Sequence, residues 1–222
     1  MWGYYFQQLV ASLPFFLKGL GVTVLVSLTS LTAGTILGFI IGVARSSRRK
    51  ALRRLFSIYV DFMRGTPFLV QLFIVFFIFP EFGVQLEAFT AAVLSLTIYA
   101  GAYICEIVAG GIDAVPSGQR EAALAFGLNR WQQLRYVILP QAMRTILPPL
   151  VGQYVLLIKD SSVVSVIGVT DVTRVGWLTV QRVPEGLMVF GLVGILYFAV
   201  CFPLIKVANK LERLITREEV KL

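Results

Sequence analysis

The chain alternates between long apolar blocks and shorter polar stretches. Each apolar block is long enough to cross a bilayer as a helix, for which about 20 residues are needed. The sequence therefore predicts an all-α membrane protein in which residues 1–222 form a single transmembrane domain. We expect about five transmembrane helices, at about residues 19–43, 55–80, 88–112, 136–169 and 187–208.

The stretch before the first predicted span, residues 1–18, is amphipathic and carries six aromatic side chains. Aromatic rings are enriched at the headgroup level of membranes, so this stretch is predicted to lie in the interface. It has no basic n-region and no small-residue cleavage site. It therefore does not have the pattern of a secretory signal peptide.

Glycines indicate that two of the predicted spans are closely packed. Small residues at four-residue spacing share one face of a helix and let a neighbouring helix approach. In the first span the glycines at this spacing are Gly34, Gly38 and Gly42, and in the third span Gly101, Gly110 and Gly111 are expected to permit close contacts.

Basic residues are concentrated between and after the apolar blocks. Three stretches, residues 45–54, 120–144 and 206–221, hold fifteen of the 20 Lys and Arg residues. Basic loops beside spans mark the cytoplasmic face. With five spans, the N-terminus is therefore predicted to lie outside and the C-terminus inside. The basic residues on the predicted outer side are Lys18, Arg174 and Arg182.

The composition excludes several classes of function. With 57% hydrophobic and 14% charged residues, the chain is too apolar for a soluble domain of 222 residues. The net charge of +8 could indicate nucleic-acid binding, but the basic residues lie beside spans, which favours a signal for membrane orientation. The chain has no His, and Cys105 and Cys201 lie in apolar runs. We therefore expect buried free thiols, no metal site and no catalytic residues.

The longest polar interruption, at about residues 113–140, predicts two helices joined by a tight turn. A helix-forming run, residues 119–126, precedes Gly127, which can adopt the left-handed conformation that ends a helix. Asn129, with Gln132 three positions later, forms the pattern of a capping box that begins a second helix. This loop is predicted to lie where the chain leaves the membrane.

The same interruption resembles the EAA loop of the membrane subunits of ABC importers. That pattern has Glu-Ala-Ala, three residues, Gly, nine residues, Ile, one residue and Leu-Pro, and Val137 takes the Ile position here. The Glu-Ala-Ala and Gly spacing alone would also fit an ordinary helix-turn-helix loop, but Leu-Pro at the proper distance favours the EAA loop. In that family the loop docks into a groove on the cytoplasmic ATPase. The resemblance thus implies ATPase coupling for Glu121, Ala122, Ala123, Gly127, Leu139 and Pro140.

Further stretches resemble the polar amino acid branch of these permeases, and the resemblance covers most of residues 20–205. They are Arg64-Gly65-Thr66-Pro67, Ala102-Tyr103 with Glu106 and Gly110-Gly111-Ile112, and Lys159-Asp160-Ser161-Ser162 with Val164-Ser165-Val166-Ile167-Gly168. One departure is Ala109, because the branch usually has Arg before the Gly-Gly pair. If that Arg contacts substrate or a partner, this subunit would do less of that work than its companion.

The resemblance implies the transmembrane subunit of an ATP-driven amino acid importer in the bacterial cytoplasmic (inner) membrane. The implied partners are two cytoplasmic ATPase subunits, a second permease subunit that is homologous or identical, and an extracytoplasmic amino acid-binding protein. The chain has no Gly-rich phosphate loop ending in Gly-Lys-Ser/Thr. We therefore expect a non-catalytic permease subunit that binds no cofactor, with ATP and Mg bound by the partner ATPase.

A secondary amino acid transporter without an ATPase partner is the alternative, since broken helices with midplane charges also occur in such proteins. Those folds usually carry internal repeats in a longer chain, and no repeat is evident within these 222 residues. The sequence therefore favours the ABC importer.

Charged residues inside the second and third spans are candidates for the substrate pathway. Thr66 precedes Pro67, which predicts a break or kink in the second span, and Arg64 lies just before this break. Glu106 is predicted at a similar depth in the third span, and a charge there must be paired or face water. Two interpretations stay open: an Arg64–Glu106 ion pair that holds the helix break, or Arg64 facing the pathway and meeting a substrate carboxylate.

A second charged site is predicted near the middle of the apolar region 146–169. Asp160 lies there beside Lys159, and adjacent residues on a helix point about 100° apart, so the two should not simply neutralise each other. We hypothesise that this segment lines the central cavity, with Asp160 facing the ammonium group of the amino acid and the Ser161 hydroxyl available for hydrogen bonding. The alternative is that Asp160 only caps a helix that starts at Ser161.

Overall fold

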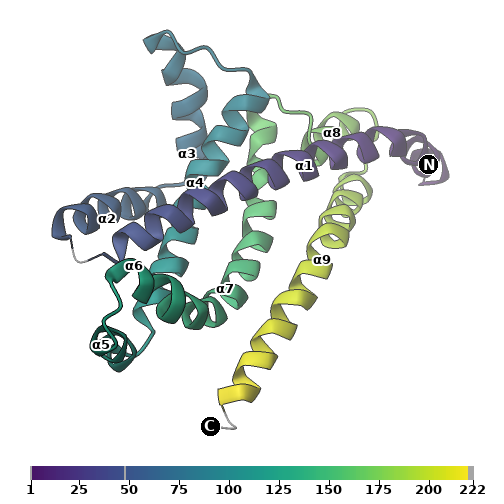
Figure 1. The fold of residues 1–222 in the computed structure, drawn as a ribbon. Helices are drawn as coiled ribbons and strands as arrows, with labels where there is room; N and C mark the ends of the chain where they lie inside the picture. The colour runs from purple at the N-terminus through teal and green to yellow at the C-terminus, as the bar shows by residue number, and fades with distance from the viewer. Residues whose placement is uncertain (1, 48, 220–222) are drawn as a thin grey trace.

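A computed structural model describes residues 2–47 and 49–219, and Figure 1 shows its fold. Within these ranges the chain consists of helices and short connections, with no β-strand. In chain order the elements are α1 (Trp2–Arg45), α2 (Lys50–Gly65), α3 (Phe68–Phe73), the π-helical η1 (Ile74–Ile78), the 3-10 helix η2 (Phe79–Phe82), α4 (Ala88–Asp113), α5 (Ser117–Ala125), α6 (Arg130–Gln132), the π-helical η3 (Gln133–Ile138), α7 (Leu139–Asp160), the 3-10 helix η4 (Ser161–Ile167), α8 (Val172–Val180) and α9 (Gly186–Glu219).

Four helical segments of the described residues are long and apolar enough to cross a membrane. They are Gly3–Arg45, Ala88–Asp113, Arg130–Ile167 and Gly186–Ile215, and α2 with Phe68–Phe82 makes a fifth if this bent pair is one span. The predicted all-α membrane fold with about five spans is confirmed. The predicted break at Thr66 and Pro67 is also confirmed, because the two halves of the second span differ in direction by 106°.

Helix α1 runs unbroken through the stretch predicted to be interfacial and through the first predicted span. Its 44 residues extend about 66 Å at 1.5 Å per residue, roughly twice the hydrocarbon core of a bilayer, which is about 30 Å thick. The N-terminal part therefore extends beyond that core, and Figure 1 shows it passing α8. Residue 18 is not a helix end, and the helix continues even through Pro14.

The glycine face of α1 packs directly against α4, as the four-residue spacing predicted. A Cβ atom added to Gly34, Gly38 or Gly42 would lie 2.7 Å from an atom of α4 in each case. Gly101 and Gly111 of α4 are equally enclosed, by Leu37 and Ile146 respectively. The same prediction is wrong for Gly110, because no described atom lies within 4 Å of the position of its Cβ. Helix α4 is therefore the buried centre of the bundle.

The stretch at residues 170–186, predicted to be polar and to lie outside, contains a helix with a buried face. Val172 and Val175 of α8 are buried in one apolar cluster with residues of α1 and α9. In Figure 1, α8 lies at the same end of the molecule as the N-terminus, whereas α5 and the C-terminal end of α9 lie at the opposite end. This arrangement agrees with the predicted separation of an outer and a basic inner side.

Candidate functional site

The side chain of Gln71 in α3 bridges the break between α2 and α3 by hydrogen bonds to the C-terminal end of α2. Its Nε2 atom donates to the Met63 carbonyl (2.9 Å), to the Thr66 carbonyl (3.2 Å) and to Thr66 Oγ1 (2.8 Å). Thr66 Oγ1 itself donates to the carbonyl of Phe62 at 2.8 Å. Backbone carbonyls at the end of α2 thus receive the hydrogen bonds that Pro67 cannot give. Thr66, predicted as a pathway residue, has its hydroxyl engaged in holding the break.

Glu106 joins three helices through two ion pairs. The predicted contact with Arg64 of α2 is present, with Nη1 and Oε2 3.5 Å apart. Arg45, the last residue of α1, donates from its Nη1 to the same oxygen atom. One carboxylate therefore faces two guanidinium groups, and the cluster carries a net charge of +1. The Arg64 side chain remains 44% exposed.

Arg45 was not among the predicted site residues, because it stands in the basic stretch 45–54 that was predicted to be cytoplasmic. A signal was present, because the glycine face of α1 predicts contact with α4, and Arg45 follows Gly42 by three residues on that helix. Residues three apart on a helix share a face. Arg45 therefore continues the glycine face at the end of α1, and from there it reaches Glu106 of α4.

Two tyrosines of α4 lie next to this cluster. The Arg64 Cζ atom lies 5.7 Å from the centroid of the Tyr103 ring, which is within the range of a cation–π interaction. The Tyr103 and Tyr99 rings are 4.9 Å apart between centroids, and the Tyr99 hydroxyl donates to the Tyr103 hydroxyl at 3.3 Å. Phe68, directly after the break, packs against Tyr99 at 4.9 Å. The break, the ion pairs and the tyrosines thus form one continuous site.

Asp160 ends α7, and its side chain makes no capping hydrogen bond to η4 within the described part of the chain. The capping alternative therefore has no contact to support it. Asp160 is half-buried. Ser161 is buried, donates to the Ile158 carbonyl (2.7 Å) and accepts from Ser27 of α1 (3.2 Å). Its hydroxyl is thus engaged within the protein.

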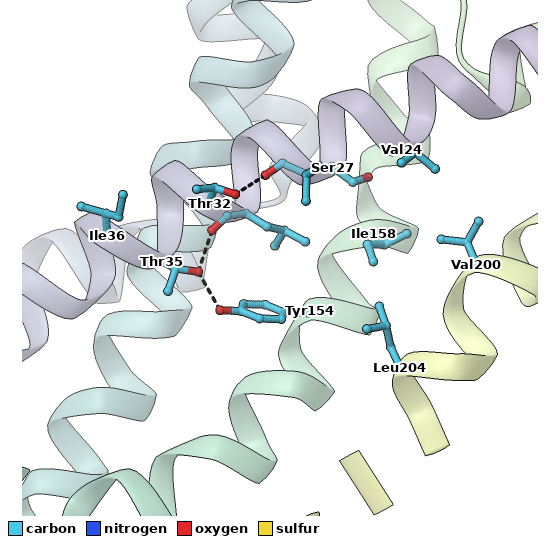
Figure 2. A pocket seen from close by; sticks show the side chains of 11 residues that line it. Val24, Ser27, Thr32, Thr35, Ile36, Tyr154, Ile158, Val200 and Leu204 are labelled. Atoms are coloured by element: carbon cyan, nitrogen blue, oxygen red, sulfur yellow. Dashed lines mark hydrogen bonds between the residues drawn. The ribbon is translucent and has the colours of Figure 1, made fainter. Parts of the chain in front are cut away.

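A separate groove of about 460 Å³ lies between α1, α7 and α9, as Figure 2 shows. Its lining is mostly apolar, and its hydroxyl groups bond to one another or to α1. Thr35 donates to the Leu31 carbonyl (2.6 Å) and lies 2.8 Å from the Tyr154 hydroxyl, and Thr32 donates to Leu28 (2.7 Å). A polar molecule would lose hydrogen bonds to water here without replacement. The groove therefore suits apolar groups better than a polar molecule.

The loop between α4 and α7 has the predicted helix–turn–helix form. Helix α5 ends before Gly127, which has φ +75, and the Leu128 N–H donates back to the Ala123 carbonyl at 3.1 Å. Asn129 and Gln132 form a complete capping box. Leu139 begins α7 directly after the π-helical η3, with Pro140 in its first turn, where proline is tolerated because the first N–H groups of a helix have no intrahelical partner. The predicted left-handed turn at Gly127 and the predicted capping box are therefore both confirmed.

The outer surface of this loop is unusually apolar for an exposed loop. Phe126 is 86% exposed, and Leu124 and Trp131 are each 65% exposed. Ala123 is buried against the protein, whereas Glu121 and Ala122 are exposed. Exposed apolar patches of this kind mark interaction surfaces. We call Leu124, Phe126 and Trp131 the loop patch.

A family model described as "Binding-protein-dependent transport system inner membrane component" matches residues 34–216. The chain belongs to this family. Among curated relatives it is similar to the "Probable amino-acid ABC transporter permease protein YckA" of Bacillus subtilis, with 40% identity over 90% of this chain and 89% of the relative. It is also similar to the L-cystine transport system permease protein TcyB of Bacillus subtilis, with 38% identity over 94% and 89%. The glutamine transport system permease protein GlnP of Escherichia coli shares 35% identity over 91% and 93%.

Solved structures of similar permeases have the same fold. The chain in a crystal structure of an amino acid ABC transporter with histidines matches with a TM-score of 0.86 and 35% identity, covering 94% of this permease and 97% of that chain. A chain of the MetNI methionine ABC transporter in an inward-facing form matches with a TM-score of 0.78 over 91% and 97%, at 21% identity. At this low identity, the second match supports a similar fold and nothing further.

Proposed function

We propose that this permease is the transmembrane subunit of an ATP-driven amino acid importer. The observation that carries the proposal is the loop patch, which spans the end of α5 and α6 at the basic end of the molecule. A patch of three exposed apolar side chains beside exposed small residues fits a groove on a partner. The names of the relatives YckA, TcyB and GlnP support an amino acid as the transported molecule.

Within this proposal, the loop residues have distinct tasks in docking the ATPase. Glu121 and Ala122 face the ATPase, with one charge and little bulk, while Ala123 holds α5 against the protein. Gly127 turns the chain back. Leu139 and Pro140 begin α7, so that movement of the loop is transmitted to a membrane-spanning helix.

The assembly that completes this function contains two cytoplasmic ATPase subunits, a second permease subunit and an extracytoplasmic amino acid-binding protein. ATP and Mg are bound by the ATPase, and this subunit is non-catalytic and carries no cofactor. The bacterial cytoplasmic (inner) membrane is its location, and nucleic acid is not a partner. Closure of the ATPase on ATP opens the pathway outward, and hydrolysis returns it inward.

The pathway is formed around Arg64, Thr66, Glu106, Asp160 and Ser161. The Asp160 side chain makes no capping hydrogen bond, and in this proposal its carboxyl group meets the ammonium group of the substrate. Arg64 keeps guanidinium donors that its contact with Glu106 does not use, because a guanidinium has five N–H groups. Thr66 and Ser161 support this site by holding the backbone on either side.

The test of the proposed function is the change Gly127→Val in the complete complex. A β-branched residue resists the positive φ of this position, so the turn after α5 should be displaced. We expect loss of ATPase co-purification and of ATP-dependent amino acid uptake in proteoliposomes, with normal membrane insertion. Gly194→Val is the matched control, because no described atom surrounds that glycine and it lies on α9, far from the loop.

Two outcomes would contradict the proposal. The first is Gly127→Val with normal ATPase association and normal substrate-stimulated hydrolysis. The second is amino acid uptake by the wild-type chain in proteoliposomes that contain no ATPase, which would indicate a secondary transporter.

A further inference from the structure

Helix α2 presents a long apolar face that the rest of the chain leaves uncovered. On its inner side, Val60 is buried and Tyr59 is half-buried in a small apolar cluster with α4. Another side carries Leu55, Ile58 and Phe62, which are each more than half exposed. They are three and four residues apart and therefore share one face of the helix. We call these three residues the open face, and an apolar face of this kind marks an interaction surface.

A further face of α2 is basic. Lys50, Arg53 and Arg54 are exposed there, and within the part of the chain that the structure describes none of them forms an ion pair. Asp61 is also exposed on this face, with one negative charge against three positive charges. We call Lys50, Arg53 and Arg54 the basic face. A basic face beside an exposed apolar face is typical of a helix that lies in the interface of an anionic membrane.

The bend after α2 determines which part of this segment can cross the bilayer. α2 and Phe68–Phe82 differ in direction by 106°, and Figure 1 shows the sharp turn between α2 and α3. The two parts therefore cannot both follow the membrane normal. Five of the 16 residues of α2 are charged, whereas Phe68–Phe82 contains one charged residue, Glu81 in η2. The apolar part, Phe68–Phe82, is thus the one suited to cross.

The length of Phe68–Phe82 indicates the depth at which α2 lies. Its 15 residues extend about 22 Å at 1.5 Å per residue, about 8 Å less than a hydrocarbon core of about 30 Å. Amphipathic helices enter the boundary between headgroups and acyl chains by about 5–10 Å, which makes up this difference. With Phe68–Phe82 along the normal, α2 lies within 16° of the membrane plane, because 106° exceeds a right angle by 16°.

We propose that α2 lies in the plane of the inner membrane interface and binds anionic lipids. The open face enters the acyl chains, and the basic face donates hydrogen bonds to the phosphate groups of the lipid headgroups. The leaflet is the inner one, because α2 begins in the basic stretch 45–54. Arg64, near the end of the same helix, pairs with Glu106 of α4. The lipid surface that holds α2 therefore also supports this ion pair.

The first measurement is the depth of the open face in the complete complex, reconstituted in lipid vesicles. A fluorescent label on Leu55→Cys or on Phe62→Cys is quenched by lipids that are brominated at several depths. The two positions are seven residues apart, which is about 10 Å along a helix. With α2 in the interface, their depths should agree within about 3 Å.

The matched control for depth lies on the spanning helix α9. Phe198→Cys and Ile205→Cys are also seven residues apart, and both side chains are exposed. Because α9 crosses the membrane, the depths of these two labels should differ by about 8–10 Å. The control shows that the quenching can resolve a helix that spans from one that lies in the interface.

The second measurement is the headgroup preference at the open face. Quenching of a label on Ile58→Cys by brominated phosphatidylglycerol and by brominated phosphatidylcholine gives the relative binding constant of the two lipids. We expect phosphatidylglycerol to be preferred, and Arg53→Gln should lower the ratio by about fivefold. A ratio is independent of how much of the complex is folded. The matched control is Arg213→Gln on α9, an exposed guanidinium whose removal should leave the ratio unchanged.

Three results would overturn the proposal. A difference in depth of about 10 Å between Leu55→Cys and Phe62→Cys would make α2 a steep spanning helix. Labels that no brominated lipid quenches would show that a protein, such as a second permease subunit or the ATPase, covers the open face. An equal preference for the two headgroups, or an unchanged ratio in Arg53→Gln, would mean that the basic face binds no anionic lipid. All three results would leave the proposed importer in place, because none of them concerns transport.

Discussion

Asp171 is fully buried although it carries a carboxyl group, and its side chain joins α8 to α9. Its Oδ1 accepts from the backbone N–H of Arg174 at 2.8 Å and thereby caps α8. Its Oδ2 accepts from the Tyr197 hydroxyl of α9 at 3.3 Å, and the adjacent Val172 N–H donates to Thr23 of α1 at 3.1 Å. Asp171 and Val172 together therefore help to fix α8 between α1 and α9.

The burial of Asp171 predicts a dependence of stability on pH. Burial raises the pKa of this carboxyl group above its usual value, against the opposing effect of the hydrogen bonds it accepts. Because the folded-state pKa is the higher one, the folded protein holds the proton more tightly, and this contribution to stability is lost as pH rises through the folded-state pKa. Asp171→Asn keeps an acceptor for the cap and does not titrate. Its unfolding temperature relative to wild type should therefore increase from pH 4 to pH 7.

The matched variant is Asp171→Ala, which removes the cap as well as the charge. It should be less stable than the Asn variant at every pH, by about 1 kcal/mol, as for a lost N-cap. Thermal unfolding of the purified complex between pH 4 and pH 7 measures both effects. A constant difference between wild type and Asp171→Asn over this range would show that the charge of Asp171 costs nothing in the folded state.

Individual contacts could be predicted where they depend on local sequence. The left-handed Gly127 and the capping box of Asn129 and Gln132 are both set by residues within a few positions of one another. Contacts between distant residues were predicted only in part. The Arg64–Glu106 pair was identified because both charges were placed at a similar depth, whereas Arg45 was missed because it follows the last apolar residue of α1.

At the scale of elements, the contact between α1 and α4 is the most extensive in the fold, and it depends on glycine. Gly38 is closest to the backbone of α4, since a Cβ atom there would lie 2.7 Å from the Gly101 carbonyl oxygen as well as from Ile104. Backbone atoms cannot move aside as a flexible side chain can. The two helices would have to separate to admit even a methyl group.

Gly38→Ala is therefore expected to destabilise the protein by about 1–3 kcal/mol, the usual cost of overpacking. Gly21→Ala is the matched control on the same helix, because no described atom lies within 4 Å of its Cβ position. There alanine should be neutral or slightly stabilising, as it is in an open helix position. The unfolding temperatures of both variants in detergent give the comparison. Equal effects at the two positions would mean that α1 and α4 are not packed through this glycine face.

For the bend between α2 and α3, the sequence predicted the position of the break but not its angle. Pro67 predicts that the helix breaks, because the residue before proline avoids the helical conformation. The angle of 106° depends on what each half packs against. Phe68 rests on Tyr99 and Gln71 closes the end of α2, and neither contact has a local signal. The similar depth predicted for Arg64 and Glu106 still identified their contact, because Arg64 lies in α2 before the break.

For the whole molecule, the distribution of basic residues determines how the fold sits in the membrane. The loop between α4 and α7 and the C-terminal end of α9 carry many of the basic residues and lie at the same end in Figure 1. The opposite end holds α8 and η2, where Glu81 lies. Positive charge is retained on the cytoplasmic side of membrane proteins. The loop patch and the C-terminus should therefore face the cytoplasm, with η2 outside.

This orientation can be measured by the reactivity of introduced cysteines. Cys105 and Cys201 are both buried and free, so the wild-type chain should give a low background with a membrane-impermeant maleimide. In intact spheroplasts, Glu81→Cys should be labelled, whereas Lys210→Cys should be labelled only after the membrane is permeabilised, because both side chains are exposed but at opposite ends. The reverse pattern would place α5 on the outer side, where no ATP-binding partner could reach it, and would contradict the proposed coupling together with the orientation.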